Sequence, residues 1–168
     1  MRRAALVLGV VALAALTACT SPDTAPVPTT AADPYVCAGV PQEGTELALG
    51  GSGTAKETGS WLADGPAFSC AVTRSGGKVF VTYGDPTTFL SLDQAGQQLD
   101  AEPLTADGDG SGYVFGDSRA TAMWVCGEHV LAVELIGVDV KGRDQRDDAE
   151  NLLISMLPWA CGDTAVPE

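Results

Sequence analysis

Four cysteines are spread widely along the chain and restrict its fold more than any other feature: Cys37, Cys70, Cys126 and Cys161. Zinc ligands usually occur in pairs with C-x-x-C spacing, which none of these cysteines has, and His129 is the only histidine. We therefore favour two disulfides over a metal site. Three pairings are possible. We favour Cys37 with Cys70 and Cys126 with Cys161, because each pair would join a predicted helical segment to a predicted strand.

The N-terminus has the pattern of an export signal, which would take the chain to an oxidising compartment. Arg2 and Arg3 precede an uncharged apolar run from Ala4 to Leu16. As a helix this run would be about 20 Å long, too short to cross a hydrocarbon core of about 30 Å. We therefore interpret residues 1–18 as a removable signal peptide.

The end of this segment, Leu16-Thr17-Ala18-Cys19, resembles the lipobox of bacterial lipoproteins, in which Leu and two small residues precede a cysteine. The resemblance implies that Cys19 carries a lipid and becomes the first residue of the mature chain. The membrane is then a partner through this N-terminal lipid, and the domain lies on the extracytoplasmic face of the cell membrane. The alternative is an ordinary signal peptide with an incidental cysteine near its end.

Residues 19–34 are predicted to be a tether, followed by a single domain at 35–168. Residues 20–34 contain four Pro and five Ser or Thr, with Val27 as the only large hydrophobe. Such a composition favours extended backbone and predicts that the segment does not enter a core. Fifteen residues of this kind would reach up to about 45 Å from the lipid.

Alternation of apolar and polar residues predicts two β-hairpins in the domain. The strands are expected at 69–74 and 78–83, joined by Ser75-Gly76-Gly77, and at 119–126 and 130–140, joined around Gly127. Residues 52–68 are rich in Gly and Pro and are predicted to be a long loop.

Helical spacing predicts a strong C-terminal helix, with Asp144 as its N-cap and Pro158 as its end. Shorter helices are expected at 40–49 and, more weakly, at 89–99. The fold class is therefore α+β: an antiparallel sheet of about four to five strands from two hairpins, packed by the C-terminal amphipathic helix and one or two short helices, and stapled by two disulfides.

The sequence has nine Lys and Arg against 22 Asp and Glu, so its net charge is −13. This acidity argues against binding to nucleic acid, whose phosphates repel anionic proteins. The expected partner is therefore an unknown protein or a component of the cell envelope.

One loop has the spacing of a calcium site. In Asp107-Gly108-Asp109-Gly110-Ser111-Gly112, alternate oxygens match the first positions of an EF-hand loop, and Asp107, Asp109 and Ser111 are the candidate ligands for Ca²⁺. The twelfth position, normally Glu, is Ser118. The alternative is a Gly-rich turn between strands, because turns favour the same residue types.

No catalytic set emerges from the sequence. Gly50-Gly51-Ser52-Gly53-Thr54 lacks the last Gly of a nucleophile elbow, and a catalytic triad would have to use His129, which is expected on a solvent-facing turn. Neither a phosphate-binding loop nor a dinucleotide fingerprint is present. We therefore expect no enzyme activity and no cofactor apart from the candidate Ca²⁺.

Taken together, these features resemble small surface lipoproteins of actinobacteria, a resemblance that assigns no functional residues. The expected function is that of a lipid-anchored extracytoplasmic protein with a non-catalytic binding domain. The alternative is a calcium-dependent binding module that uses the loop from Asp107 to Ser111.

Overall fold

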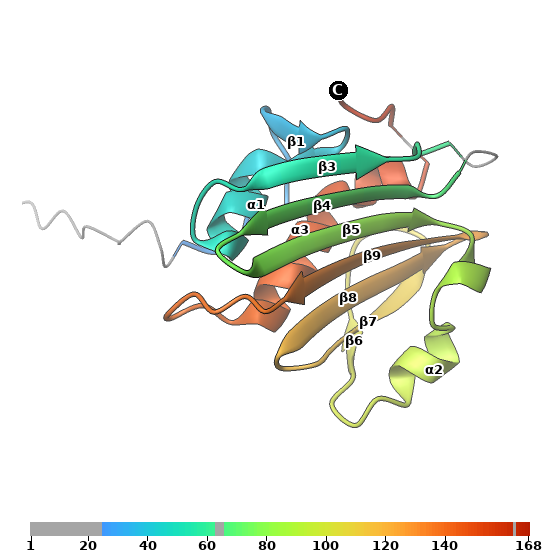
Figure 1. The fold of residues 1–168 in the computed structure, drawn as a ribbon. Helices are drawn as coiled ribbons and strands as arrows, with labels where there is room; N and C mark the ends of the chain where they lie inside the picture. The colour runs from blue at the N-terminus through green and yellow to red at the C-terminus, as the bar shows by residue number, and fades with distance from the viewer. Residues whose placement is uncertain (1–24, 63–65, 163) are drawn as a thin grey trace, which may run out of the picture.

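The computed structural model describes residues 25–62, 66–162 and 164–168 (Figure 1). The predicted signal peptide and Cys19 lie outside these residues. The elements, in chain order, are β1 (Tyr35–Cys37), β2 (Val40–Pro41), α1 (Gln42–Leu49), β3 (Thr54–Thr58), β4 (Phe68–Arg74), β5 (Gly77–Gly84), the 3₁₀ helix η2 (Pro86–Thr88), α2 (Leu92–Gly96), β6 (Glu102–Leu104), β7 (Ser111–Phe115), β8 (Arg119–Cys126), β9 (His129–Ile136) and α3 (Gln145–Ala160).

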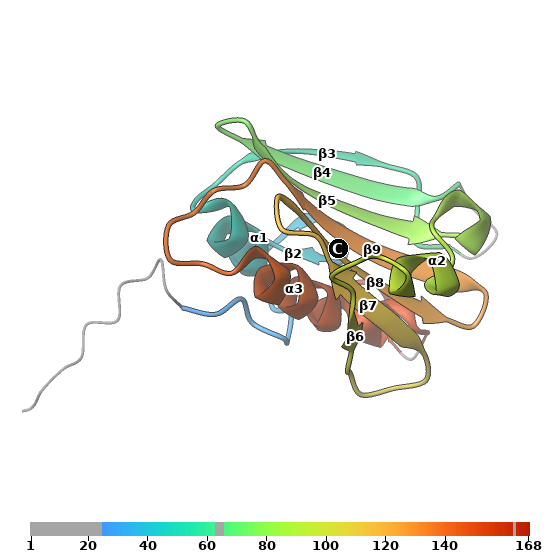
Figure 2. The ribbon, with the colours of Figure 1, turned by 90° about the horizontal axis from the view of Figure 1, so that it is seen from below.

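Seven strands form one antiparallel sheet in the order β3-β4-β5-β9-β8-β7-β6, and β1 and β2 form a separate two-stranded sheet. Helices α1 and α3 lie behind the large sheet in Figure 1 and below it in Figure 2. Only one face of the sheet is therefore covered by these helices, and we call the other the open face. The α+β class with an antiparallel sheet is as predicted, but the sheet has seven strands instead of four to five.

The core lies between the sheet and α3. Val81 on β5, Val133 on β9 and three α3 residues, Leu152, Leu153 and Met156, are completely inaccessible to solvent. Full burial of an aliphatic side chain stabilises the fold by about 1.5–3 kcal/mol. The strand alternation that predicted the hairpins is the alternation between this core and the open face.

The C-terminal helix begins as predicted but ends later. The Asp144 carboxylate caps it by accepting a hydrogen bond of 2.9 Å from the Arg146 backbone N–H. Pro158 was predicted to end the helix, and this is wrong, because α3 continues to Ala160 with Pro158 inside it. A proline removes a single backbone donor, and the next turn still closes through the Cys161 N–H, which donates to the Leu157 carbonyl at 2.9 Å.

Several elements differ from the predictions. The predicted loop at 52–68 contains strand β3, and β1, β2 and β6 had no predicted counterpart. Strand β3 is exposed at all five positions, so it lacks the apolar alternation that marks a half-buried strand. The helix expected at 89–99 is the shorter α2, and β9 ends at Ile136 instead of continuing to residue 140.

The disulfides join Cys37 to Cys70 and Cys126 to Cys161, the pairing that we favoured, with Cα–Cα distances of 6.2 and 5.5 Å. Cys37 lies on β1, so the first bridge joins two strands and not a helix to a strand. The second bridge fastens the end of α3 to β8, as expected.

Part of the predicted tether belongs to the folded domain. Val27 is only 2% exposed and packs in the main core, so the prediction that residues 20–34 stay out of the core is wrong at this position. Arg143 also holds this segment, because its guanidinium donates a hydrogen bond of 2.7 Å to the Ala25 carbonyl.

Among the described residues, no helix has the length and apolar character needed to span a membrane.

Candidate functional site: the open face of the sheet

The open face carries three rows of side chains that run across the strands. Register places Lys56, Ala71, Phe80, Glu134, Thr121 and Phe115 in the middle row. The row on one side of it consists of Thr54, Thr73, Lys78, Ile136 and Arg119. The row on the other side consists of Thr58, Ser69, Thr82, Ala132, Met123 and Tyr113. Side chains directly opposite on neighbouring antiparallel strands lie on the same side of a sheet and contact one another.

The connection between β5 and β6 covers one half of this face. Ala95 on α2 is completely buried and packs on Met123, Val130 and Ala132 in a second, smaller apolar cluster. Helix α2 is only five residues long, and it starts with a capping box in which Ser91 and Gln94 bond each other's backbone N–H groups. The connection therefore covers the part of the open face around Met123 and Ala132, on β8 and β9, and leaves the part on β3, β4 and β5 bare.

A groove of about 460 Å³ lies between this cover and strands β7, β8 and β9. Its lining combines apolar side chains with the ion pair of Arg119 and Glu134. The apolar residues are Phe89, Leu90, Phe115, Met123 and Ala132, and the remaining ones are Gln98, Gly116 and Thr121. Apolar walls with a few placed polar groups are the usual composition of a ligand-binding hollow.

The ion pair in the groove is unequally exposed. Arg119 Nε donates to Glu134 Oε2 at 2.6 Å, and a second contact comes from Arg119 Nη2. The Arg119 side chain is 62% exposed, whereas that of Glu134 is 18% exposed. Glu134 therefore holds the Arg119 guanidinium in place, while the outer edge of this group faces solvent and has N–H donors that Glu134 does not use.

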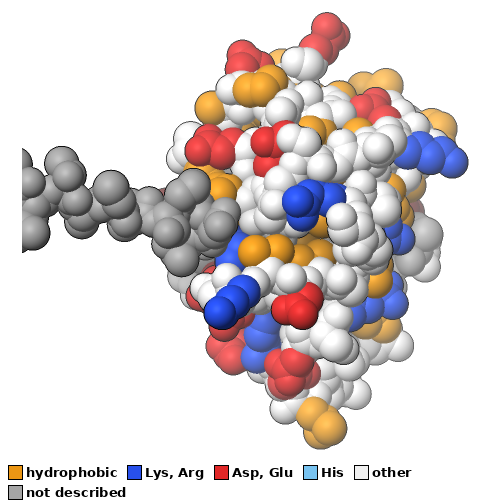
Figure 3. All heavy atoms as spheres, turned by 60° about the vertical axis from the view of Figure 1, so that its left-hand side comes forward, with side chains coloured by type: hydrophobic (Ala, Val, Ile, Leu, Met, Phe, Trp, Pro, Cys, Tyr) orange, Lys and Arg blue, Asp and Glu red, His pale blue; other side chains and the backbone are white. Residues whose placement is uncertain are grey.

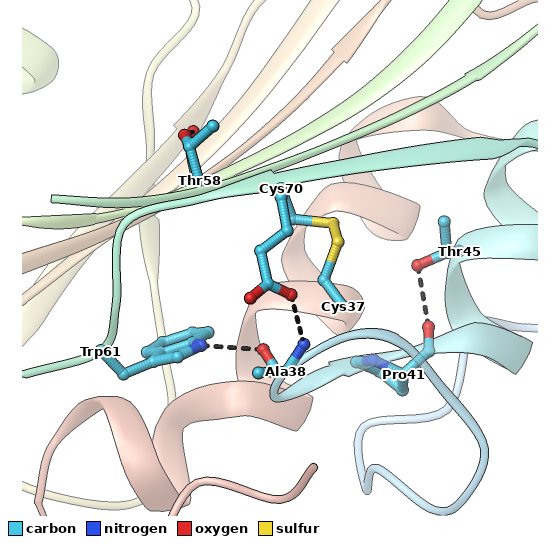
Figure 4. Close-up of a disulfide and its surroundings, with 9 residues drawn as sticks. Cys37, Ala38, Pro41, Thr45, Thr58, Trp61 and Cys70 are labelled. Atoms are coloured by element: carbon cyan, nitrogen blue, oxygen red, sulfur yellow. Dashed lines mark hydrogen bonds between the residues drawn. A yellow bond between two sulfur atoms is a disulfide. The ribbon is translucent and has the colours of Figure 1, made fainter.

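The bare half is rich in hydroxyl groups. Thr58 Oγ1 and Ser69 Oγ lie 2.7 Å apart across β3 and β4, and Thr82 follows in the same row on β5. Figure 4 shows Thr58 on one side of these strands and the Cys37–Cys70 disulfide on the other. This view separates the open face from the core side.

The opposite side of the same strands carries an aromatic stack. The rings of Trp61 and Tyr83 are 5.1 Å apart, and those of Tyr83 and His129 are 5.3 Å apart and nearly parallel. Burial raises the pKa of the Tyr83 phenol, so this group stays neutral at physiological pH. His129 was expected on a solvent-facing turn, but it is the first residue of β9 and only partly exposed.

The candidate calcium ligands lie together on one exposed stretch between β6 and β7. Asp107 and Asp109 are in the connecting loop, and Ser111 is the first residue of β7. The loop borders a hollow of about 890 Å³ beside the Cys126–Cys161 disulfide. Within the described part of the chain, no three Asp, Glu, His or Cys residues are grouped as metal ligands. The calcium site stays a prediction.

Comparisons with protein-family models, curated proteins and solved structures returned no match.

The open face was not predicted as a site, although the sequence contains part of the signal. In the predicted hairpin, Ser69, Thr73, Lys78 and Thr82 alternate with buried apolar residues and therefore share one side. The remaining part of the face could not be found in this way, because it depends on the unpredicted strand β3 and on where α2 packs.

Proposed function

We propose that this chain is a non-catalytic binding protein, anchored by a lipid on Cys19 to the extracytoplasmic face of the cell membrane, and that it binds its partner through the open face. The observation that carries the proposal is the division of the sheet into two unlike faces. One face is filled by α1 and α3, whereas the other has a bare half and a groove that holds an exposed guanidinium. A protein or a component of the cell envelope is the partner of this face.

The anchoring part of the proposal rests on the lipobox-like sequence and is supported by the two disulfides, which are typical of proteins outside the cytosol. The test is Cys19→Ser in the full chain. We expect the wild-type protein in the membrane fraction, labelled by added palmitate, and the variant unlabelled and released from the membrane. A variant that stays in the membrane fraction would contradict the lipid anchor.

The binding part is tested by photo-cross-linking on intact cells. A photoreactive amino acid is placed at Leu90 in the groove, at Thr73 on the bare half, or at Lys141, an exposed control position outside the open face. We expect an adduct of one defined mass from Leu90 or Thr73, weakened by Arg119→Ala, and none from Lys141. Adducts from Lys141 alone would place the binding surface elsewhere.

The absence of catalysis is tested by screening the purified full chain for hydrolysis of ester, peptide and glycoside substrates. The proposal expects no turnover above the solvent rate. Turnover that His129→Ala abolishes would make the chain an enzyme and would contradict the proposal.

A further inference from the structure

The strand positions on the open face carry a net positive charge, whereas the chain as a whole is acidic. The whole sequence has a net charge of −13. Among the described strands, however, the positions that face the open side carry three cations, Lys56, Lys78 and Arg119, against a single carboxylate, Glu134. In Figure 3 the front of Figure 1 turns towards the right-hand edge, and some of the Lys and Arg side chains are visible there, while others lie in the middle and lower left of the view. Such a segregated positive patch attracts an anionic partner although the protein as a whole is acidic.

The two lysines are available to such a partner. Glu134 is already engaged by Arg119, and neither Lys56 nor Lys78 forms an ion pair with a described residue. Lys56 is on β3 and Lys78 on β5, two strand spacings apart, which places them on the order of 10 Å from each other. Two lysines whose backbones are this far apart suit a ligand with repeated negative charges better than a single small anion.

Hydroxyl groups surround the two cations. Thr54 and Thr73 share the row of Lys78, and Thr58, Ser69 and Thr82 form the row on the other side of Lys56. Each hydroxyl can donate one hydrogen bond and accept two, so the surface suits a partner that also bears many hydroxyl groups. Polysaccharides are polymers of this kind.

An aromatic ring completes the surface. Phe80 lies in the middle row between the hydroxyl rows, and the Lys78 ammonium is 4.9 Å from the centre of its ring. Because the ammonium lies over the ring, the ring holds the positive charge of Lys78 at this surface, where it faces the acidic substituent of a sugar.

The same features disfavour a lipid surface as the occupant. Docking into a bilayer requires protruding apolar side chains, and burial of hydroxyl and ammonium groups without partners costs free energy. The large hydrophobic side chains that are exposed in the described chain are Leu62, Leu90 and Leu99, and none of them lies on a strand of the sheet.

We propose that the bare half of the open face, on β3, β4 and β5, binds an anionic polysaccharide. Lys56 and Lys78 contact the acidic groups of its sugars, and the surrounding Ser and Thr hydroxyls contact their hydroxyl groups. This proposal rests on the proposed function, since it names the chemical class of the partner for the same face.

The test measures binding of the full chain, purified in detergent, to immobilised polygalacturonate, to a phosphate-bearing mannan and to neutral dextran by interferometry. We expect binding to at least one acidic polymer, with dextran at least tenfold weaker, and weakening at higher salt because the contacts are electrostatic. Comparable binding to dextran, or no binding to either acidic polymer, would overturn the proposal.

The chain offers a matched control, because Lys56, Lys78 and Lys141 are its only lysines and Lys141 is outside the open face. Lys56→Gln and Lys78→Gln should each weaken polysaccharide binding at least threefold, whereas Lys141→Gln, with the same change in net charge, should stay within twofold. Equal effects of all three substitutions would show non-specific charge attraction and overturn the proposed surface. Thr73→Val adds a variant without a charge change and should also weaken binding.

Failure of this proposal and failure of the proposed function give different results. A protein adduct from the photoreactive residue at Thr73, together with no binding to either acidic polymer, would replace the polysaccharide by a protein partner and retain the open face. Polysaccharide binding that persists in the Lys56→Gln/Lys78→Gln double variant, with adducts only from Lys141, would overturn both.

Discussion

Arg143 and Asp148 form a bidentate pair at the start of α3, with Nε–Oδ2 and Nη2–Oδ1 distances of 2.7 and 2.6 Å. Their side chains are only 3% and 6% exposed. The same guanidinium donates to the Ala25 carbonyl, so one buried cation connects the first described residues, the loop before α3 and the helix itself. Charge-assisted hydrogen bonds of this geometry are among the strongest in proteins.

Removing one member of this pair should therefore be costly. We expect Arg143→Gln to lower the free energy of unfolding by about 3 kcal/mol or more, because the Asp148 carboxylate would remain buried without its cation. Urea denaturation monitored by circular dichroism measures the loss. Arg119→Gln is the control, since the Arg119 side chain is 62% exposed and its ion pair should contribute less than about 1 kcal/mol. Equal losses from the two substitutions would contradict this account.

The stability of a Val27→Ala variant tests whether the segment before β1 is part of the fold. We expect Val27→Ala to lower the free energy of unfolding by about 2 kcal/mol, from lost apolar burial and from the cavity left between α1 and α3. The control is Thr29→Ala, an exposed position in the same segment, which should change stability by less than about 0.5 kcal/mol. A Val27→Ala variant as stable as wild type would show that the segment does not pack on the core in solution.

Val27 also shows why the sequence predicted some parts of the fold and not others. The hairpins β4–β5 and β8–β9 and the helix α3 carry their own periodic signal, so local pattern alone located them. Val27 is an isolated hydrophobe among Pro and Thr, and only its contacts with residues far away in the chain make it a core residue. Composition therefore assigned the whole segment to a tether.

The open face was missed for a related reason. Its rows arise from the register of β3, β4, β5 and β9, and register is a property of strand pairing, which no single segment displays. The edge strand β3 is exposed along its whole length, and the edge strand β6 has only three residues, one of which is Pro103. Neither strand therefore has the alternation of apolar and polar residues that reveals a strand in the sequence. The groove further requires α2 to pack on β8 and β9, which helical spacing alone does not specify.

The two disulfides close loops of nearly equal length, with sequence separations of 33 and 35 residues. In the chain-entropy model each should stabilise the fold by about 3–4 kcal/mol. We therefore expect the double variants Cys37→Ala/Cys70→Ala and Cys126→Ala/Cys161→Ala to lose similar amounts of unfolding free energy. Urea denaturation of both, compared with wild type under non-reducing conditions, measures the losses. A variant without any loss would mean that its bridge adds no constraint to the unfolded chain.

Glu150 should make the stability of the fold depend on pH. Burial on α3 raises the pKa of its carboxyl, and the nearby charges of Asp147 and Glu102 raise it further. Because the folded-state pKa is above the unfolded value, the group favours folding when protonated, and this contribution is lost as the pH rises through the folded-state pKa. Glu150→Gln should therefore stabilise the protein at pH 7, by less than about 0.5 kcal/mol because solvent screens this partly exposed carboxyl, and have little effect near pH 3.

The control for this substitution is Glu128→Gln at an exposed position, which changes the net charge of the acidic chain by the same amount. Urea denaturation of both variants and of wild type at pH 3, 5 and 7 separates the two effects. If Glu128→Gln stabilised the fold as much as Glu150→Gln at pH 7, the gain would come from reduced overall repulsion and not from the burial of Glu150. A stabilisation by Glu150→Gln that was largest at pH 3 would contradict the raised pKa itself.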